Sequence, residues 1–384
     1  MTQAPAHPRV FFYVQHLLGI GHLARASRVA DALVADGFDV TIVTGGTPVA
    51  GFPGPKIHHV ALPTIASGDA GFSGLVDDQG KAIDDAFKQR RRDLLLDAYK
   101  SCKPDIVITE AFPFGRRQVR FELIPLLDAV HATLPRPRVV CSLRDILQER
   151  AKPGRDQESV DLVEKYYDQV LVHGDPAFVR LEETFAPADR ISDKIVYSGL
   201  VAAPPPAVVT DRFDVVVSAG GGAVGIDLVR AASDAAGQLP TSVSWCLITG
   251  PNLPQADFDS VVNSAPPNVT VVRFRKDFPG LIANARLSIS QAGYNTVCDV
   301  LRAGCRCLLV PFATGGETEQ SQRALRLKKL GLAQVLTEED LSADTMTAAV
   351  QKALEEPEPP RFSLGLDGAR GTAAILRKLF DGSA

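Results

Sequence analysis

The chain has 384 residues, of which 45% are hydrophobic and 22% are charged, and its formal net charge is -4. Length and composition are typical of a globular protein of about two domains, and the small negative charge argues against nucleic acid as the main partner. No apolar run is long enough to span a bilayer, and residues 1–8 lack a signal-peptide layout, so we expect a cytoplasmic protein, with peripheral membrane contact left open.

Short apolar runs alternate with longer amphipathic segments along the first half of the chain. We expect strands at residues 10–14, 40–44, 106–109, 139–142 and 170–172, and helices at residues 23–36 and 83–101. This alternation is typical of a parallel sheet covered by helices. The basic run at residues 88–92 lies on the second of these helices. We expect it to be a solvated face, and a patch for anionic lipid is the alternative.

The turn after the first strand is a candidate catalytic site. Gly19 and Gly21 allow a tight turn there, and the next helix begins near His22. Ligands of open α/β sheets bind at this carboxyl edge, where a neutral histidine could take a proton from an acceptor hydroxyl. In the alternative reading His22 only caps or packs the turn. His16 is the rival base, and all seven histidines lie in the first half of the chain.

Two later strands of the first half also end in polar side chains. Glu110 follows residues 106–109 and could orient His22, while Arg116 and Arg117 could meet an anionic acceptor or lie solvated on a helix. Asp145 follows residues 139–142 and is a second candidate partner for the histidine. An Arg–Asp pair on the surface is the favoured reading of that segment.

Three consecutive prolines within residues 199–212 predict a stiff linker. We therefore expect an N-terminal Rossmann-like domain at residues 1–200 and a C-terminal one at residues 201–384, with the last helix a candidate for packing back on the first domain. Strands are expected in the second half at residues 214–218, 244–249, 269–272, 287–290 and 307–310. The fold class is α/β, with two Rossmann-like domains facing across a cleft.

A glycine-rich loop opens the second domain. Gly220, Gly222 and Gly225 fit G-x-G-x-x-G between a strand and a helix that starts at Ile226. A dinucleotide site needs an acidic residue about 20 residues further on, and the next strand instead ends in Gly-Pro. NAD is therefore disfavoured, and the same loop, with Gly221, can serve a diphosphate group.

Residues 291–324 collect donors and acceptors around a strand-to-helix junction. Gln291, Gly293, Asn295 and Thr296 stand where a helix N-terminus would favour a phosphate. Three further residues are hydrogen-bonding candidates: Asp299 for ribose hydroxyls, and Glu319 and Gln320 for sugar hydroxyls. This set predicts a nucleotide-sugar donor.

The order of these residues resembles the donor signature of GT-B glycosyltransferases. In plant-type UDP-glycosyltransferases this signature runs H-C-G-W-N-S-x-x-E, followed by G-x-P and D-Q. Residues 291–299 read Q-A-G-Y-N-T-V-C-D, and Gly304, Pro311, Glu319 and Gln320 follow in order. Bacterial family 28 transferases, which include the enzyme that adds N-acetylglucosamine in lipid II synthesis, share the layout. The chain departs twice from the pattern, because Gln291 replaces a phosphate-contacting His and Asp299 replaces a ribose-contacting Glu.

The resemblance implies roles for residues in both halves. Gly21-His22 resembles the placement of the base in GT-B enzymes, and the first glycine loop with the segment from Glu110 resembles a bacterial group of predicted glycosyltransferases close to family 28. In the resembling enzymes, the segment equivalent to Phe274 and Arg275 reads the nucleotide base, although Phe274 could equally be core.

We therefore expect an inverting glycosyltransferase that needs neither metal nor cofactor. Its donor would be a UDP-sugar and its acceptor a hydroxyl compound, with anionic or lipid-linked acceptors and cell-envelope or exopolysaccharide synthesis as natural settings. Two alternatives remain open. One is a nucleotide-sugar epimerase of the same fold, which would use Glu110, Asp145 or Glu319. The other is a non-catalytic nucleotide-sugar sensor that tolerates loss of His22.

Overall fold

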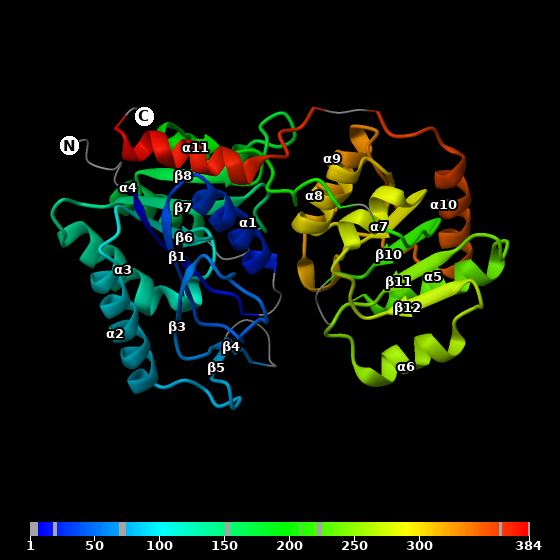
Figure 1. Ribbon diagram of the computed structural model, residues 1–384, viewed down its shortest axis with the longest axis horizontal. Coiled ribbons are helices and arrows are strands. Elements are labelled where there is room, and N and C mark those ends of the chain that lie inside the picture. The colour runs from blue at the N-terminus through cyan, green and yellow to red at the C-terminus, as the bar shows by residue number, and fades with distance from the viewer. Residues whose placement is uncertain are drawn as a thin grey trace. The chain divides into compact units, whose positions relative to one another are not determined.

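The structure is a computed structural model, and it describes residues 7–17, 21–68, 74–149, 154–207, 209–220, 225–360 and 363–382. The chain divides into two compact units (Figure 1). The first unit contains Met1–Val201 and Asp367–Ala384, and the second contains Ala202–Leu366. The sequence had suggested a division at residues 200 and 201, with the last helix as a candidate member of the first domain.

Within its described residues, the first unit is built on a seven-stranded parallel sheet of order β3-β2-β1-β6-β7-β8-β9. The strands of this sheet are β1 (Arg9–Val14), β2 (Asp39–Thr44), β3 (His58–Ala61), β6 (Ile106–Glu110), β7 (Arg138–Arg144), β8 (Gln169–His173) and β9 (Ile195–Tyr197), and a separate antiparallel pair is formed by β4 (Ala66–Ser67) and β5 (Leu75–Val76).

Helices cover this sheet, with α1 packed against α11 and α2 against α3. The helical segments are α1 (Gly21–Ala35), α2 (Asp85–Cys102), η1 (Arg117–Val119), α3 (Arg120–Ala132), α4 (Arg155–Tyr166), η2 (Leu181–Glu183), η3 (Ala186–Lys194) and α11 (Gly368–Phe380). The central strand β6 is buried along its whole length, as is typical of a parallel strand covered on both faces.

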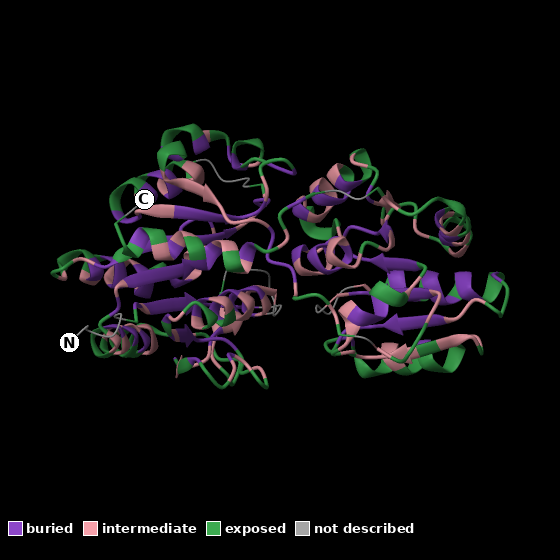
Figure 2. Ribbon diagram, turned by 45° about the horizontal axis from the view of Figure 1, so that its top comes forward, coloured by how far each residue is buried: buried purple, intermediate pink, exposed green. Residues whose placement is uncertain are grey.

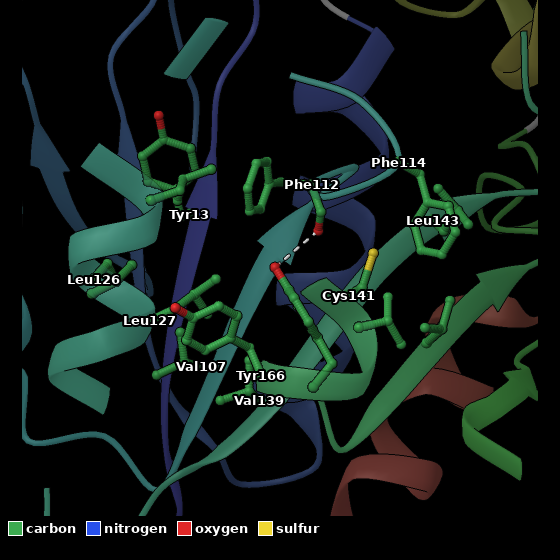
Figure 3. Close-up of a cluster of buried hydrophobic side chains, with 14 of the residues drawn as sticks. Tyr13, Val107, Phe112, Phe114, Leu126, Leu127, Val139, Cys141, Leu143 and Tyr166 are labelled. Atoms are coloured by element: carbon green, nitrogen blue, oxygen red, sulfur yellow. Dashed lines mark hydrogen bonds between the residues drawn. The ribbon is translucent and has the colours of Figure 1, made fainter. Parts of the chain in front are cut away.

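The core of the first unit lies between its sheet and these helices. Val107 of β6 and Val139 of β7 pack with Leu126 and Leu127 of α3 (Figure 3). The strands are mostly buried, while the helices also present exposed residues (Figure 2). Burial of these apolar side chains is the main force that holds the layers together.

The last helix, α11, belongs to the first unit although it follows the second in sequence. Arg377 pairs with Asp36 at 3.2 Å. Gly368 and Gly371 allow a close approach, because a Cβ atom on either would overlap the carbonyl oxygen of Gly199 or Ser198, respectively. Any larger residue at either glycine would force this helix away from the segment it covers.

Within its described residues, the second unit contains a six-stranded parallel sheet of order β12-β11-β10-β13-β14-β15. The strands are β10 (Val215–Ser218), β11 (Trp245–Ile248), β12 (Val269–Val272), β13 (Leu287–Ser290), β14 (Arg306–Leu309) and β15 (Gln334–Val335). The helical segments are α5 (Ile226–Gln238), α6 (Gln255–Ser264), α7 (Phe278–Asn284), α8 (Tyr294–Ala303), η4 (Thr314–Gly316), α9 (Glu319–Lys329) and α10 (Ala343–Glu355).

Both strand orders reverse direction at one point, between β1 and β6 in the first unit and between β10 and β13 in the second. Ligands of open α/β sheets bind beyond the carboxyl ends of the strands at such a switch point. The predicted α/β organisation with parallel sheets is thus confirmed, and each unit carries predicted site residues at its own switch point.

The basic run on α2 is not a simple solvated face. Arg91 is fully buried, and its guanidinium donates to both carboxylate oxygens of Glu122 at 2.9 and 2.7 Å. The Tyr13 hydroxyl donates to the same carboxylate at 2.5 Å. Consecutive helical residues point in different directions around the axis. Within residues 88–92, Arg91 therefore faces inward, where its charge must be paired.

No helix in the described ranges is both long enough and apolar enough to cross a membrane.

Candidate active site

A histidine and a carboxylate meet at the switch point of the first unit. His22 lies in the first turn of α1, and Glu110 is the last residue of β6. The distance from His22 Nδ1 to Glu110 Oε1 is 3.0 Å. Nδ1 also lies 3.3 Å from Arg25 Nη2, which only donates, but the contact with Glu110 is shorter. Because an ionised carboxylate only accepts hydrogen bonds, that contact puts the proton on Nδ1 and leaves Nε2 as the basic nitrogen. The sequence had proposed this pairing, and the structure brings the two side chains together.

Electrostatics keep the carboxylate ionised and the imidazole neutral. Burial alone would raise the pKa of Glu110, but the charge of Arg25 and the hydrogen bonds from His22 and Ser142 outweigh it and hold the pKa well below its usual range. Burial, followed by the charge of Arg116, lowers the pKa of His22 from 6.5 to about 3, although Glu110 opposes both. The imidazole is therefore uncharged at neutral pH, as a general base must be.

Arg25 was not singled out by sequence reasoning, although it lies one turn after His22 in α1. Its side chain is 3% exposed and forms an ion pair with Glu110. The i,i+3 spacing from His22 places both side chains on one face of the helix. This spacing is the sequence feature that could have identified Arg25 as a second partner of Glu110, once Glu110 was known to face α1.

Arg116 and Arg117 have separate environments. Arg116 adopts a left-handed backbone conformation with φ of 58°, and its Nε donates to the carbonyl oxygen of Gln15 at 2.9 Å. Burial and the nearby charge of Arg144 lower the pKa of Arg116 to about 10, so it remains a cation. Arg117 pairs with Glu158 instead. The reading of a solvated arginine pair on a helix is therefore wrong for Arg116.

The other two candidates of the first unit are less suited to proton transfer. Asp145 is fully buried and accepts a hydrogen bond from Ile146 N at 2.9 Å, so the favoured reading of a surface Arg–Asp pair is wrong. Glu110, rather than Asp145, is the carboxylate seen against His22. His16 is 5% exposed, and its Nε2 contacts the carbonyl oxygen of Thr47 at 2.9 Å.

In the second unit, the glycine loop after β10 meets Gln291, which stands where the resembling signature has a histidine. Gly220 and Gly225 have φ of 78° and 109°, values that favour glycine. A Cβ atom on Gly220 would lie 3.2 Å from Oε1 of Gln291, and one on Gly225 would lie 3.2 Å from its Nε2. The Gln291 amide thus lies against both ends of the loop. Gly221 and Gly222 lie outside the described residues.

Helix α8 begins three residues after this glutamine. Gly293 is its N-cap, with an extended backbone, and the helix starts at Tyr294, two residues earlier than predicted. Asn295 and Thr296 therefore lie in the first turn, at the positive end of the helix dipole. Asp299 is 7% exposed and accepts a hydrogen bond from Ala203 N at 3.4 Å.

The residues expected to hold the sugar lie at the start of α9. Glu319 is buried, and its carboxylate pairs with Arg323 at 2.6 Å. Arg323, which the sequence reasoning missed, also donates to the carbonyl oxygen of Ala292 at 2.9 Å. It thereby ties α9 to the loop before α8, and its i,i+4 spacing from Glu319 was the available signal. Gln320 accepts a hydrogen bond from Phe312 N at 3.2 Å.

The segment after β12 offers an exposed aromatic ring. Phe274 is 58% exposed, so the reading of this residue as ordinary core is wrong. Arg275 forms ion pairs with Asp277 at 2.7 Å and with Asp211 at 2.8 Å.

The second unit matches a known domain family. Residues 215–362 match the Glycosyltransferase family 28 C-terminal domain. The UDP-N-acetylglucosamine--N-acetylmuramyl-(pentapeptide) pyrophosphoryl-undecaprenol N-acetylglucosamine transferase of Desulfitobacterium hafniense strain Y51 is 32% identical over 112 residues, or 29% of this chain and 30% of that protein. The enzyme of the same name from Phenylobacterium zucineum is 37% identical over 103 residues, or 27% and 28%. The chain matches less than a third of the length of these curated relatives, and the resemblance to family 28 is confirmed for this region.

Solved structures extend the likeness to the whole chain. CalG4, the calicheamicin glycosyltransferase, aligns with a TM-score of 0.60 and 17% identity, covering 99% of this chain and 96% of that one. Acinetobacter baumannii MurG aligns with a TM-score of 0.60 and 15% identity, covering 98% and 100%. At such identities the likeness establishes the fold, and the predicted GT-B glycosyltransferase fold is confirmed.

Proposed function

We propose that the protein is an inverting glycosyltransferase that moves a sugar from a nucleotide-sugar donor to a hydroxyl acceptor. The observation that carries this proposal is the His22–Glu110 contact of 3.0 Å, in which a buried carboxylate orients a neutral imidazole. It occurs in a chain whose second unit matches a glycosyltransferase domain. A histidine held in this way is suited to take a proton from a hydroxyl group.

The donor is assigned to the second unit. The first turn of α8 would meet the diphosphate with the N–H groups and side chains of Asn295 and Thr296, and the amide of Gln291 lies beside the glycine loop. Exposed Phe274 could lie against the base. A UDP-sugar is the proposed donor, since the named relatives use UDP-N-acetylglucosamine.

In the proposed reaction, His22 Nε2 takes the proton of the acceptor hydroxyl as its oxygen attacks the anomeric carbon. The bond from that carbon to the diphosphate oxygen breaks, and its electron pair leaves with the nucleoside diphosphate. Attack from the face opposite the leaving group inverts the anomeric centre. Glu110 stabilises the imidazolium that forms. The donors around α8 would stabilise the diphosphate electrostatically, so we propose that no metal is needed.

The charge of Arg116 favours an anionic acceptor. This cation is one of the causes that lower the pKa of His22. An acceptor phosphate that neutralised Arg116 would raise that pKa toward the range in which a base works best at neutral pH. A lipid-linked diphosphate acceptor, and hence a place in cell-envelope synthesis, fits both this charge and the pyrophosphoryl-undecaprenol in the relatives' names.

The epimerase alternative needs an acid that can move a proton at carbon. Glu110 and Glu319, two of the candidates, are each held in a buried ion pair with an arginine. Such a pair fixes a carboxylate in place, which suits an orienting or structural role better. Release of an epimerised free sugar would favour the epimerase, and unchanged biological activity without His22 would favour the sensor.

The test of the proposal is a comparison of two histidine variants. His22→Ala should lower turnover by roughly 10²–10⁴-fold, the range for a positioned general base, with donor affinity nearly unchanged. His16→Ala is the control and should cost much less. Activity should persist in EDTA. Full activity of His22→Ala, or loss of activity in chelator with recovery on adding magnesium or manganese, would overturn the base assignment or the metal-free mechanism, respectively.

A further inference from the structure

A chain of buried hydrogen bonds continues from Glu110 on the side away from His22. The Ser142 hydroxyl lies 2.5 Å from Glu110 Oε2 and 2.9 Å from His173 Nε2. On its other side, His173 Nδ1 lies 2.9 Å from the Ser198 hydroxyl. His173 is fully buried, so it does not touch a substrate, and the proposed reaction assigns it no role.

The sheet explains why these side chains meet. Glu110 of β6 pairs in register with Ser142 of β7, and directly paired residues present their side chains on the same face. Leu171 of β8 is the register partner of Ser142. His173 is two residues further along β8, and side chains two apart share a face. Three neighbouring strands therefore bring the carboxylate, the hydroxyl and the imidazole into one row.

Counting protons fixes the direction of each bond. An ionised Glu110 only accepts, so the single hydroxyl proton of Ser142 is donated to Oε2. Ser142 must then accept the bond from His173, whose Nε2 therefore carries a proton. If His173 is neutral, its Nδ1 has a lone pair and can accept the proton of Ser198, for which the carbonyl oxygen of Gly199, at 3.1 Å, is a second acceptor. All three contacts are satisfied by one arrangement of protons.

The charges around His173 support the neutral form. Arg25 and Glu110 are the charged groups that act on it, and both belong to the same cluster. Burial, followed by the charge of Arg25, lowers the pKa of His173 to about 3, with Glu110 opposing. A neutral His173 is thus a fixed hydrogen-bond donor to Ser142 at neutral pH.

We infer that His173 is a positioning residue for the base His22, acting through Ser142 and Glu110. This inference rests on the proposed function. Glu110 has two oxygens, and Oε1 serves His22 and Arg25 while Oε2 serves Ser142. His173 occupies an acceptor site of the Ser142 hydroxyl, so the serine proton points at Oε2 and the carboxylate cannot turn away from His22.

Ser198, the last residue in this series of hydrogen bonds, is held in place by its backbone. Ser198 N donates to the carbonyl oxygen of Val172 at 3.0 Å, and the carbonyl of Ser198 lies against Gly371 of α11, where a Cβ atom would overlap it. The hydroxyl that holds His173 Nδ1 is therefore on a segment fixed by both the sheet and a helix. The orientation of His22 therefore depends, through Ser198 and His173, on residues that do not contact the substrate.

Paired substitutions test the inference. His173→Asn removes the Nε2 donor and should lower kcat about 10-fold, as expected for loss of one well-placed hydrogen bond, with KM nearly unchanged. His173→Gln keeps a donor at the position of Nε2 and should restore most of kcat. Ser142→Ala should match His173→Asn. The double variant should be no worse than either single one, because the residues act as a unit.

Nitrogen-15 NMR of the histidine rings supplies a readout that needs no donor. In the unmodified protein His22 should show a protonated Nδ1 and a bare Nε2, and Ser142→Ala and His173→Asn should both show a mixture of His22 tautomers. His131→Ala is the matched control. This histidine contacts the carbonyl oxygen of Tyr166 at 3.0 Å and takes no part in the hydrogen bonds between Glu110 and Ser198. Its loss should leave the tautomer of His22 unchanged.

The outcomes separate the inference from the proposed function. Unmodified protein that transfers no sugar from any donor would remove the proposed function, whereas the NMR comparison would still decide the role of His173. If the His22 tautomer is the same in Ser142→Ala and in the unmodified protein, the inference is wrong. Should His173→Asn fail to fold, Ser142→Ala and His173→Gln give the answer alone.

Discussion

Replacement of Glu110 by glutamine is the sharpest structural perturbation of the site, because the side chain keeps its shape and loses its charge. Three donors meet this carboxylate, namely His22 Nδ1, Arg25 and the Ser142 hydroxyl. A glutamine amide has one oxygen to accept them and adds an NH₂ group that needs acceptors of its own. At least one buried donor therefore loses its acceptor, and buried Arg25 loses the negative charge of the carboxylate that it pairs with.

The size of the effect follows from that burial. Breaking a buried ion pair on one side costs about 3–5 kcal/mol. For the first unit, of about 220 residues, this lowers the melting temperature by roughly 6–20 °C, at about 2–4 °C for each kcal/mol. The charge of Arg25 also lowers the pKa of His22, and in Glu110→Gln no carboxylate opposes it. We therefore expect turnover to fall by roughly 10²-fold or more.

The assay combines thermal unfolding at pH 7 with a kinetic measurement on the same samples. Glu158→Gln is the matched control, because Glu158 is also paired with arginine, namely with Arg117 and Arg120, but its side chain is 29% exposed. An exposed pair contributes about 0–1 kcal/mol, so the control should melt within a few degrees of the unmodified protein. Equal melting temperatures for Glu110→Gln and Glu158→Gln would refute the account of Glu110 as a buried charge that holds the site together.

Two further predictions follow from the charges around His22. Because Arg116 lowers the pKa of His22, Arg116→Gln should move the acidic limb of kcat/KM to higher pH, while Arg117→Gln, which removes a surface ion pair, should not move it. An unmoved limb in Arg116→Gln would show that its charge does not act on the base. The second prediction concerns stability, because His22 and His173 both have a pKa near 3 when folded and near 6.5 when unfolded. The unfolded state binds more protons below pH 6.5, so stability falls as the pH drops from 7 to 5, by about 2 kcal/mol for each histidine. Urea unfolding should show this slope, and the double variant His22→Asn/His173→Gln should flatten it; an unchanged slope would mean that neither histidine is buried in its neutral form.

Much of the fold could be predicted because the strands of a parallel sheet appear in the sequence as short runs rich in apolar and β-branched residues. Val269–Val272 and Leu287–Ser290 were predicted residue for residue, and Gly304 ends α8 in a left-handed conformation, as expected of a glycine at that point. The meeting of His22 and Glu110 could also be anticipated, since both follow strands at the carboxyl edge of one sheet.

The buried charges could not be predicted in the same way. A basic run gives no sign that Arg91 alone turns inward, because its partner Glu122 lies on another helix. Asp145 and Arg323 are likewise charged residues whose burial depends on tertiary neighbours. The role suggested for His173 needs the order of β6, β7 and β8 in the sheet, which local sequence does not contain. Sequence reasoning treats charged side chains as exposed by default, and these residues are the exceptions.

The most direct test of the central claim is a binding measurement with nucleotide sugars. Thermal shift and calorimetry would compare the UDP, GDP and dTDP sugars on the unmodified protein and on Asn295→Ala. We expect one nucleotide class, UDP, to stabilise the protein, with a melting temperature that rises with the logarithm of ligand concentration above the dissociation constant. The variant should bind it more weakly by roughly 1–3 kcal/mol, the cost of a lost hydrogen bond to a charged group. If no nucleotide sugar binds, or if Asn295→Ala binds the UDP-sugar with unchanged affinity, the assignment of the donor to the start of α8 is contradicted.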